Sequence, residues 1–139
     1  MKERSFLDTS ILLYTDDSQA PTKQAKALAL LQAGWASGNA VISTQVLREY
    51  FSAATQKLGL PIDLAQRKIE LMASQMEVMS IDSDDILKAI EINKSQGFSF
   101  WEALIIRMAQ KSDCTILYSD VIQPQRTLAG LEIVNPFQS

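Results

Sequence analysis

The chain has 139 residues, of which 47% are hydrophobic and 21% are charged, and its formal net charge is −3 at pH 7. These values predict one globular domain over residues 1–139 and argue against a broad basic surface for nucleic acid. The sequence holds no histidine and one cysteine, Cys114, which excludes catalysis through a histidine and zinc sites built from histidine or from several cysteines.

The N-terminal segment predicts a short strand over residues 5–7, which ends at Asp8. Because Asp8 interrupts the first apolar run at once, that run does not have the form of a signal peptide. The other apolar runs are far shorter than the roughly 20 residues that a membrane-spanning helix needs. We therefore expect a cytoplasmic protein that makes no membrane contact.

Strands and helices alternate along the rest of the chain. Apolar residues at helical spacing predict the helices, and short apolar runs predict the strands. In chain order, the expected elements are a helix over 22–37, a strand over 40–42, helices over 44–58 and 62–75, a strand over 77–81, a helix from 83 to the stop at Gly97, a helix over 99–111, and strands over 115–118 and 131–134. This alternation favours an α/β fold with a parallel sheet covered on both faces.

The helix over 99–111 is apolar on almost every side, so we expect it to be buried on most sides and central in the fold. Its apolar residues are Trp101, Ala103, Leu104, Ile105, Ile106, Met108 and Ala109.

Two aspartates follow predicted strands. Asp8 comes directly after the first strand, and Asp120 comes two residues after the strand over 115–118. Strand ends form the edge of the sheet at which open α/β folds build their sites. Each residue also has a structural explanation, since Asp8 can cap or turn the segment that follows it and Asp120 can be a turn aspartate.

Two glutamates lie on predicted helices. Glu49 has no basic residue three or four positions away on either side, so it lacks a local ion pair, although a solvated surface position would also explain it. Glu102 follows Ser99 by three residues, which is the pattern of a capping box as well as a site for a carboxylate at the start of a buried helix. Acids at the start of the helix from 83, which are Asp82, Asp84 and Asp85, are interpreted as ordinary helix-start residues.

The four acids are most informative together. Carboxylates that share one pocket repel one another, and a hard divalent cation is the natural way to keep them ionised. With histidine absent and cysteine single, an enzyme of this sequence must rely on such carboxylates. The pattern therefore predicts a site for a hard divalent cation at the sheet edge.

Four stretches of the sequence resemble the PIN domain family, and most closely its VapC-type ribonuclease toxins. They are Phe6 to Ser10, Val46 to Phe51, Ser99 to Ile106 and Ile116 to Asp120. The resemblance implies a Rossmann-like three-layer α/β/α sandwich and a metal-dependent endoribonuclease of a toxin–antitoxin pair. It further implies an RNA substrate, an antitoxin protein as partner and a homodimer. The catalytic residues and the ligands of Mg²⁺ or Mn²⁺ would be Asp8, Glu49, Glu102 and Asp120.

The sequence departs from the family pattern at two places. The third acid, usually aspartate, is Glu102 here, and the third place counted from Ser119, where the family carries Asp or Asn, is Val121. Either the loop is shifted by one residue so that Asp120 reaches the pocket, or one ligand is missing. Ser10 and Ser119 are interpreted as supporting residues that orient a metal-bound water or a phosphate oxygen.

Two other functions stay open from the sequence. One is a catalytically weak PIN module that binds RNA or a protein, which the Val121 departure favours. The other is a phosphatase-like hydrolase, which lacks support because no second aspartate stands two residues after Asp8. Candidate phosphate contacts are Arg48, Lys57, Arg107 and Arg126, and candidate interface residues are Leu12, Leu13, Tyr14 and the corner from Leu58 to Ile62.

Overall fold

The computed structural model describes residues 3–123 and 127–138. In chain order, its elements are β1 (Ser5–Leu7), α1 (Thr9–Tyr14), α2 (Pro21–Ser37), β2 (Ala40–Ser43), α3 (Thr44–Gln56), α4 (Ile62–Gln75), β3 (Glu77–Met79), α5 (Ser83–Gln96), α6 (Phe100–Lys111), β4 (Ile116–Tyr118), β5 (Thr127–Leu128) and β6 (Leu131–Val134). Every helix and strand expected from the sequence is present, with ends that differ by at most two residues. Helix α1 and the two-residue strand β5 were not among the elements expected from the sequence.

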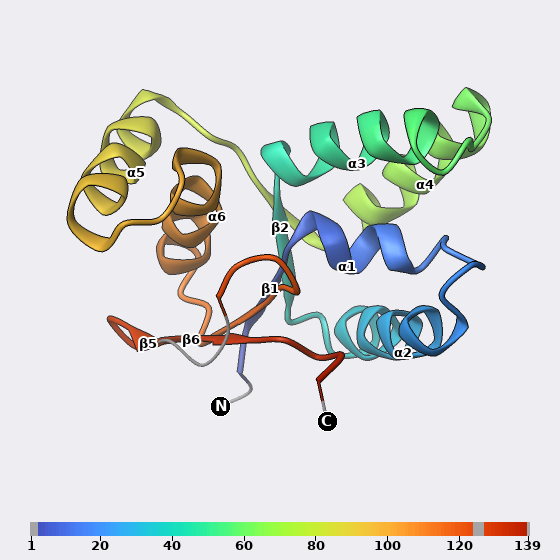
Figure 1. Ribbon diagram of the computed structural model, residues 1–139, viewed down its shortest axis with the longest axis horizontal. Coiled ribbons are helices and arrows are strands. Elements are labelled where there is room, and N and C mark those ends of the chain that lie inside the picture. The colour runs from blue at the N-terminus through green and yellow to red at the C-terminus, as the bar shows by residue number, and fades with distance from the viewer. Residues whose placement is uncertain (1–2, 124–126, 139) are drawn as a thin grey trace.

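One sheet runs through the middle of the molecule, with the strand order β3-β2-β1-β4-β6-β5. All neighbouring strands pair in parallel except β5, which pairs antiparallel with β6 at the edge. Helices α5 and α6 lie on one side of the strands and α1 and α2 on the other (Figure 1). This arrangement confirms the predicted three-layer α/β/α sandwich.

The core forms between these layers because the strands are apolar on both faces, as parallel strands under helices are. Phe6, Val41 and Leu117, from three neighbouring strands, have no exposed surface. Helix α6 is buried on most sides, as predicted, although Trp101 in its first turn is 59% exposed. Within residues 3–123 and 127–138, no helix is long and apolar enough to cross a membrane.

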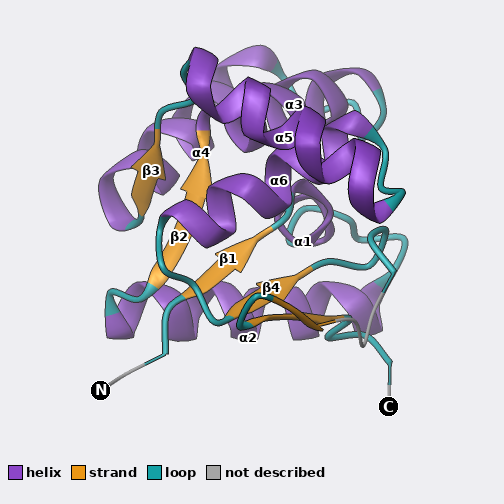
Figure 2. Cartoon of the chain, turned by 90° about the vertical axis from the view of Figure 1, so that its left-hand side faces the viewer, coloured by secondary structure: helices purple, strands orange, loops and turns teal. Residues whose placement is uncertain are grey.

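The strand order reverses between β1 and β4, which lie side by side in Figure 2. From β1 the chain proceeds outward to β2 and β3, whereas β4 and β6 lie on the other side. Ligand sites of open α/β sheets form at such a point, outside the carboxyl ends of the strands. Asp8 follows β1 and Ser119 follows β4, so both stand at this reversal.

Candidate active site

Asp8 is fixed at the end of β1 by backbone and side-chain hydrogen bonds. Its amide donates to the Tyr118 carbonyl at 3.0 Å, which ties it to β4. Its side chain caps α1: Oδ1 accepts from the Thr9 amide at 2.7 Å, and Oδ2 accepts from the Ser119 hydroxyl at 2.7 Å. Asp8 is therefore both the helix cap that the sequence allowed and a carboxylate held rigidly at the reversal point.

The Asp8 carboxyl has no cation within hydrogen-bond reach among the residues that the structure describes. It is only 5% exposed, and burial raises its pKa from the ordinary 3.8 to about 6. The negative charges of Glu49 and Asp120 also raise this pKa, while the bonds from Ser119 and Thr9 lower it. A bound cation would stabilise the ionised form of this carboxyl, because a nearby positive charge lowers the pKa of a carboxyl.

Glu49, on α3, is held at both carboxylate oxygens. The Thr9 hydroxyl donates to Oε1 at 2.7 Å, and the Gln45 amide donates to Oε2 at 3.1 Å. The sequence analysis did not identify Thr9 or Gln45 as functional. Gln45 precedes Glu49 by four residues on the same helix, a spacing at which a glutamine and an acid can pair, so the sequence could have indicated this contact. No sequence pattern indicates the contact between Thr9 and Glu49.

Glu102 takes part in the capping box that its sequence spacing predicted. Its Oε1 accepts from the Ser99 amide at 3.1 Å, and its own amide donates to the Ser99 hydroxyl at 3.2 Å. The box holds this carboxylate at the N-terminal end of α6, where the helix dipole favours a negative charge. The capping role and a role in a site are therefore compatible in this geometry.

Asp8, Glu49 and Glu102 line one pocket of about 120 Å³, which we call the acidic pocket. Its other lining residues are Gln45, Trp101, Ile105, Val121 and Ile122. The three acids come from the end of β1, from α3 and from α6, so the fold brings together residues spread over more than 90 positions. Val121, which is 64% exposed, stands among them.

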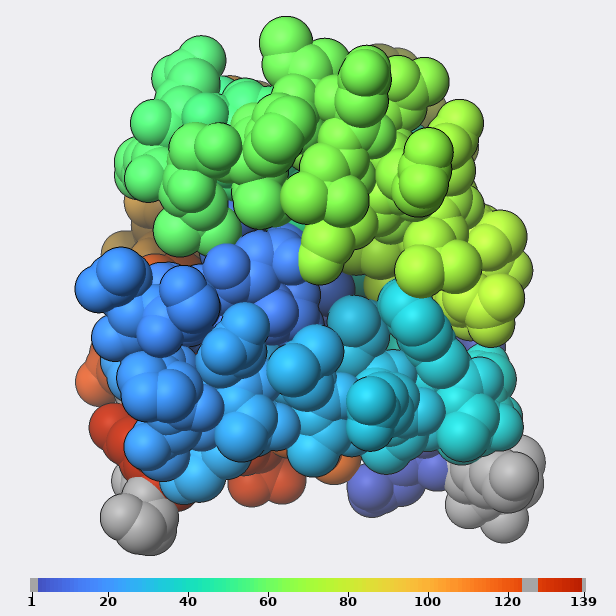
Figure 3. Space-filling model, turned by 90° about the vertical axis from the view of Figure 1, so that its right-hand side faces the viewer, coloured from blue at the N-terminus to red at the C-terminus, as the bar shows by residue number. Residues whose placement is uncertain are grey.

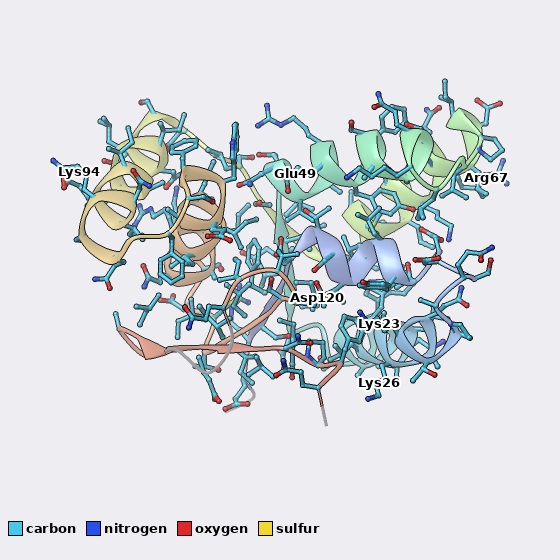
Figure 4. All side chains as sticks on the ribbon, in the orientation of Figure 1. Lys23, Lys26, Glu49, Arg67, Lys94 and Asp120 are labelled. Carbon is cyan, nitrogen blue, oxygen red and sulfur yellow. The ribbon has the colours of Figure 1, made fainter. Side chains whose placement is uncertain are left out.

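Asp120 does not line the acidic pocket. It lines an adjoining pocket of about 230 Å³ together with Ser10, Lys57 and Val121, so Val121 separates the two hollows. One Asp120 oxygen lies 3.6 Å from the Lys23 ammonium, and the Asp120 amide donates to the Ser10 hydroxyl at 3.5 Å. Figure 4 shows Asp120 beside Lys23 and below Glu49.

The turn after β4 is shaped by Ser119. Its buried hydroxyl accepts from the amides of Val121 and Ile122 at 3.2 and 3.0 Å while it donates to Asp8. These bonds hold the backbone of the turn that carries Asp120, Val121 and Ile122. Of these, Val121 and Ile122 line the acidic pocket.

The donor set of the acidic pocket suits a hydrated hard cation. Within residues 3–123 and 127–138, no three acid, cysteine or histidine side chains are arranged to hold a metal ion by themselves. Magnesium commonly takes only one or two carboxylates directly and keeps several waters. Asp8 and Glu49, which share Thr9 as donor and retain free lone pairs, fit such a role, and Glu102 lines the same pocket.

The basic residues singled out in the sequence have different surroundings. Arg48 lines an open pocket next to Glu49, and Lys57 lines the pocket of Asp120. Arg107 is engaged by Asp84 and Asp85 on α5 and is not part of the site. Arg126 lies outside the described residues.

Comparisons with known proteins place this fold. The sequence model of the PIN domain matches residues 5–126. No curated protein matches the chain.

Solved structures share the fold at low identity. A toxin–antitoxin complex from Klebsiella pneumoniae matches with a TM-score of 0.68 and 17% identity over 95% of this chain and 97% of that chain. VapBC-1 from nontypeable Haemophilus influenzae gives 0.64 and 18% over 96% and 98%. The Mycobacterium tuberculosis toxin VapC20, described as cleaving the sarcin–ricin loop, gives 0.61 and 21% over 81% and 86%.

Proposed function

This chain belongs to the PIN domain family, and from that premise we propose that it is a metal-dependent endoribonuclease and the toxin of a toxin–antitoxin pair. The observation that carries the proposal is the acidic pocket, in which Asp8, Glu49 and Glu102 meet at the point where the strand order reverses. A pocket of carboxylates without histidine supports hydrolysis of a phosphodiester through a divalent ion.

When bound, Mg²⁺ or Mn²⁺ would supply an activated water and stabilise charge on the leaving oxygen. The protein supplies the positioning. Thr9 donates to both Asp8 and Glu49, Ser119 fixes the second oxygen of Asp8, and Gln45 fixes the second oxygen of Glu49. These side chains are ordered before any ligand arrives, so little reorganisation is needed on binding.

The proposed partners are RNA as substrate, an antitoxin protein and a second copy of the chain. Two of the structural neighbours are toxin–antitoxin assemblies and a third is described as a toxin that cleaves the sarcin–ricin loop, which supports the first two partners. For a homodimer, the support is the apolar corner at Ile62, which is 63% exposed. Leu12 gives no such support, because it is completely buried.

One observation favours a second candidate, a PIN module with weak catalysis that acts by binding. Val121 lines the acidic pocket in the place where the family carries a fourth polar ligand, and Asp120 is turned toward Lys23. A valine cannot ligate a cation. The two candidates differ in whether metal-dependent cleavage can be measured.

The experiment is cleavage of a mixed RNA pool with Mg²⁺, with Mn²⁺ and with a chelator. We expect cleavage only with metal, and a loss of more than about 100-fold in Asp8→Asn, since even outer partners of metal ligands commonly contribute 10–100-fold. Glu70→Gln is the matched control, because it removes one exposed carboxylate on α4 away from the pocket.

Thermal unfolding with and without metal provides a second readout. A ligand that binds only the folded state raises the free energy of unfolding, by about 2.7 kcal/mol when its concentration is 100 times Kd, and the midpoint temperature rises with it. Glu102→Gln keeps the capping-box bond while removing the charge, so it should reduce this shift without a large loss of stability. Metal-induced stabilisation without cleavage would favour the binding module. If metal caused neither stabilisation nor cleavage in the wild type, the proposed metal site would be wrong.

A further inference from the structure

Trp101 presents an indole to solvent at the start of an otherwise buried helix. It is 59% exposed, whereas Ala103 and Leu104 just after it are buried. Single exposed apolar side chains are common on protein surfaces, but Trp101 is set apart because it also lines the acidic pocket. Its indole is therefore accessible to a ligand that binds at the acidic pocket.

The position of this residue is fixed by its surroundings. The Trp101 carbonyl accepts a hydrogen bond at 3.2 Å from Gln45, the same side chain that holds Glu49. The Phe100 ring meets the indole edge to face, with centroids 5.1 Å apart and planes at 75°. Helix α6 is thus tied to α3 at Trp101, and the indole stands beside the carboxylate of Glu49 as a preset flat surface.

Two hollows meet at this indole. Trp101, Gln45 and Glu49 line the acidic pocket, and the same three residues line an open pocket of about 410 Å³ with Arg48 and Ser52. Arg48 is exposed and forms no ion pair with any residue in the described part of the chain. Trp101 therefore lines the same pocket as the three carboxylates, and the uncommitted guanidinium of Arg48 lies in the adjoining pocket next to Glu49.

We propose that Trp101 and Arg48 form a subsite for one unpaired nucleotide next to the bond that is cut, with its base stacked on the indole and its phosphate on the guanidinium. The assignment rests on the proposed nuclease function and deepens it. Stacking on an aromatic face accepts any base, but only from a strand whose bases are not paired. The acidic pocket itself repels phosphate, so a cation placed just outside it favours a nucleic acid over an apolar peptide.

The direct test uses the intrinsic fluorescence of Trp101. The other tryptophan, Trp35, lines a separate pocket between α2 and α4, two helices visible in Figure 3, so Trp35→Phe leaves Trp101 as the sole emitter. Asp8→Asn added to this background prevents cleavage during titration. Single-stranded RNA of about eight nucleotides, within the range of strand-binding sites, should quench the emission to saturation, while the same RNA in a blunt duplex should not.

Kinetics provide the second test. Because a stacked base is bound in the ground state as well as in the transition state, Trp101→Ala should raise KM with little change in kcat. Loss of one stacked base corresponds to roughly 5- to 100-fold in KM. Trp101→Phe should retain most of the affinity, and Trp101→Leu should not, since leucine is apolar but has no aromatic face.

Leu87→Ala is the matched control, because Leu87 is 63% exposed on α5 and is not part of any pocket named above. An unchanged KM in Trp101→Ala, with wild-type cleavage intact, would overturn the subsite and leave the nuclease standing. A wild type that cleaves no RNA with metal would instead overturn the nuclease, and the fluorescence titration would still decide whether Trp101 binds a strand. If Trp101→Ala altered only self-association in sedimentation, the indole would belong to a protein contact and the subsite would be wrong.

Discussion

Asp8 and Asp85 are buried carboxylates at the starts of two helices, but they have opposite surroundings. Asp85, with no exposed surface, accepts bonds from the Arg107 guanidinium at 3.1 Å and the Lys111 ammonium at 3.0 Å. Within the described part of the chain, Asp8 accepts side-chain bonds from one amide and one hydroxyl and from no cation. Both charges are hydrogen-bonded, yet only Asp85 is neutralised by the protein itself.

The pKa values follow this difference. Burial works to raise the pKa of Asp85, but bonds from the Asp82 amide, Lys111 and Arg107 hold it below the ordinary value. The pKa of Asp8 is raised to about 6, chiefly by burial. A buried carboxylate with its own cations joins α5 to α6, whereas one without them is a candidate for an external cation.

Breaking the ion-paired cluster should have the largest effect. Asp85→Asn leaves Arg107 and Lys111 without their buried partner and should lower the free energy of unfolding by about 3–4 kcal/mol in urea, near the lower part of the range for broken buried pairs because both cations keep some exposure. The matched control is Asp84→Asn. Asp84 is 67% exposed and also pairs with Arg107, so its loss should be under about 1 kcal/mol. Equal losses in the two variants would contradict the distinction.

The second largest effect is on the pH dependence of stability, to which Asp8 and Asp85 should contribute with opposite signs. Since the folded pKa of Asp8 lies above its ordinary value, its ionisation opposes folding, and the metal-free protein should lose up to about 3 kcal/mol as pH rises from 4 to 7. Asp85 has the opposite sign: its contribution is complete above the ordinary pKa and is lost as pH falls through its lower folded pKa.

The measurement is the difference between wild type and Asp8→Asn in urea unfolding across pH 4 to 8, without metal. We expect the variant to gain relative stability as pH rises, because it has no carboxyl to ionise there. The hydrogen-bond change in the variant is common to all pH values and cancels from the slope. A difference in the free energy of unfolding that stays constant across this range would show that the pKa of Asp8 is not raised by folding.

The layers of the fold were predictable from the sequence because apolar periodicity determines them. The strands at 5–7 and 131–134 and the helix from 62 to 75 have the expected bounds. Strand β5 was not predictable, since Thr127–Leu128 is too short for any pattern and exists only by pairing with β6. The exposure of Trp101 was also hidden, because it depends on where α6 begins relative to α3 rather than on the apolar content of the helix.

For the site, the sequence supplied the acids but not their partners. That Asp8 and Glu102 would cap helices followed from local spacing, and the structure has both caps. The hydroxyl of Thr9 meets Glu49 across 40 residues of sequence, a contact that only the packing of α1 against α3 creates. Whether these acids bind metal stays a prediction.

The smallest effect concerns the two neighbours Asp120 and Val121. Asp120→Ala removes a partly exposed contact with Lys23 at 3.6 Å and should change stability by less than about 1 kcal/mol, with little change in metal affinity. Val121→Asp places a fourth carboxylate on the acidic pocket at a position that is 64% exposed, so its own stability change should be within about 0.5 kcal/mol. Metal titrations and RNA cleavage are measured for both variants. Val121→Asp should bind metal more tightly and cleave RNA faster, whereas Asp120→Ala should show neither gain. The opposite pattern, a loss in Asp120→Ala and no gain in Val121→Asp, would mean that Asp120 turns into the acidic pocket when metal binds.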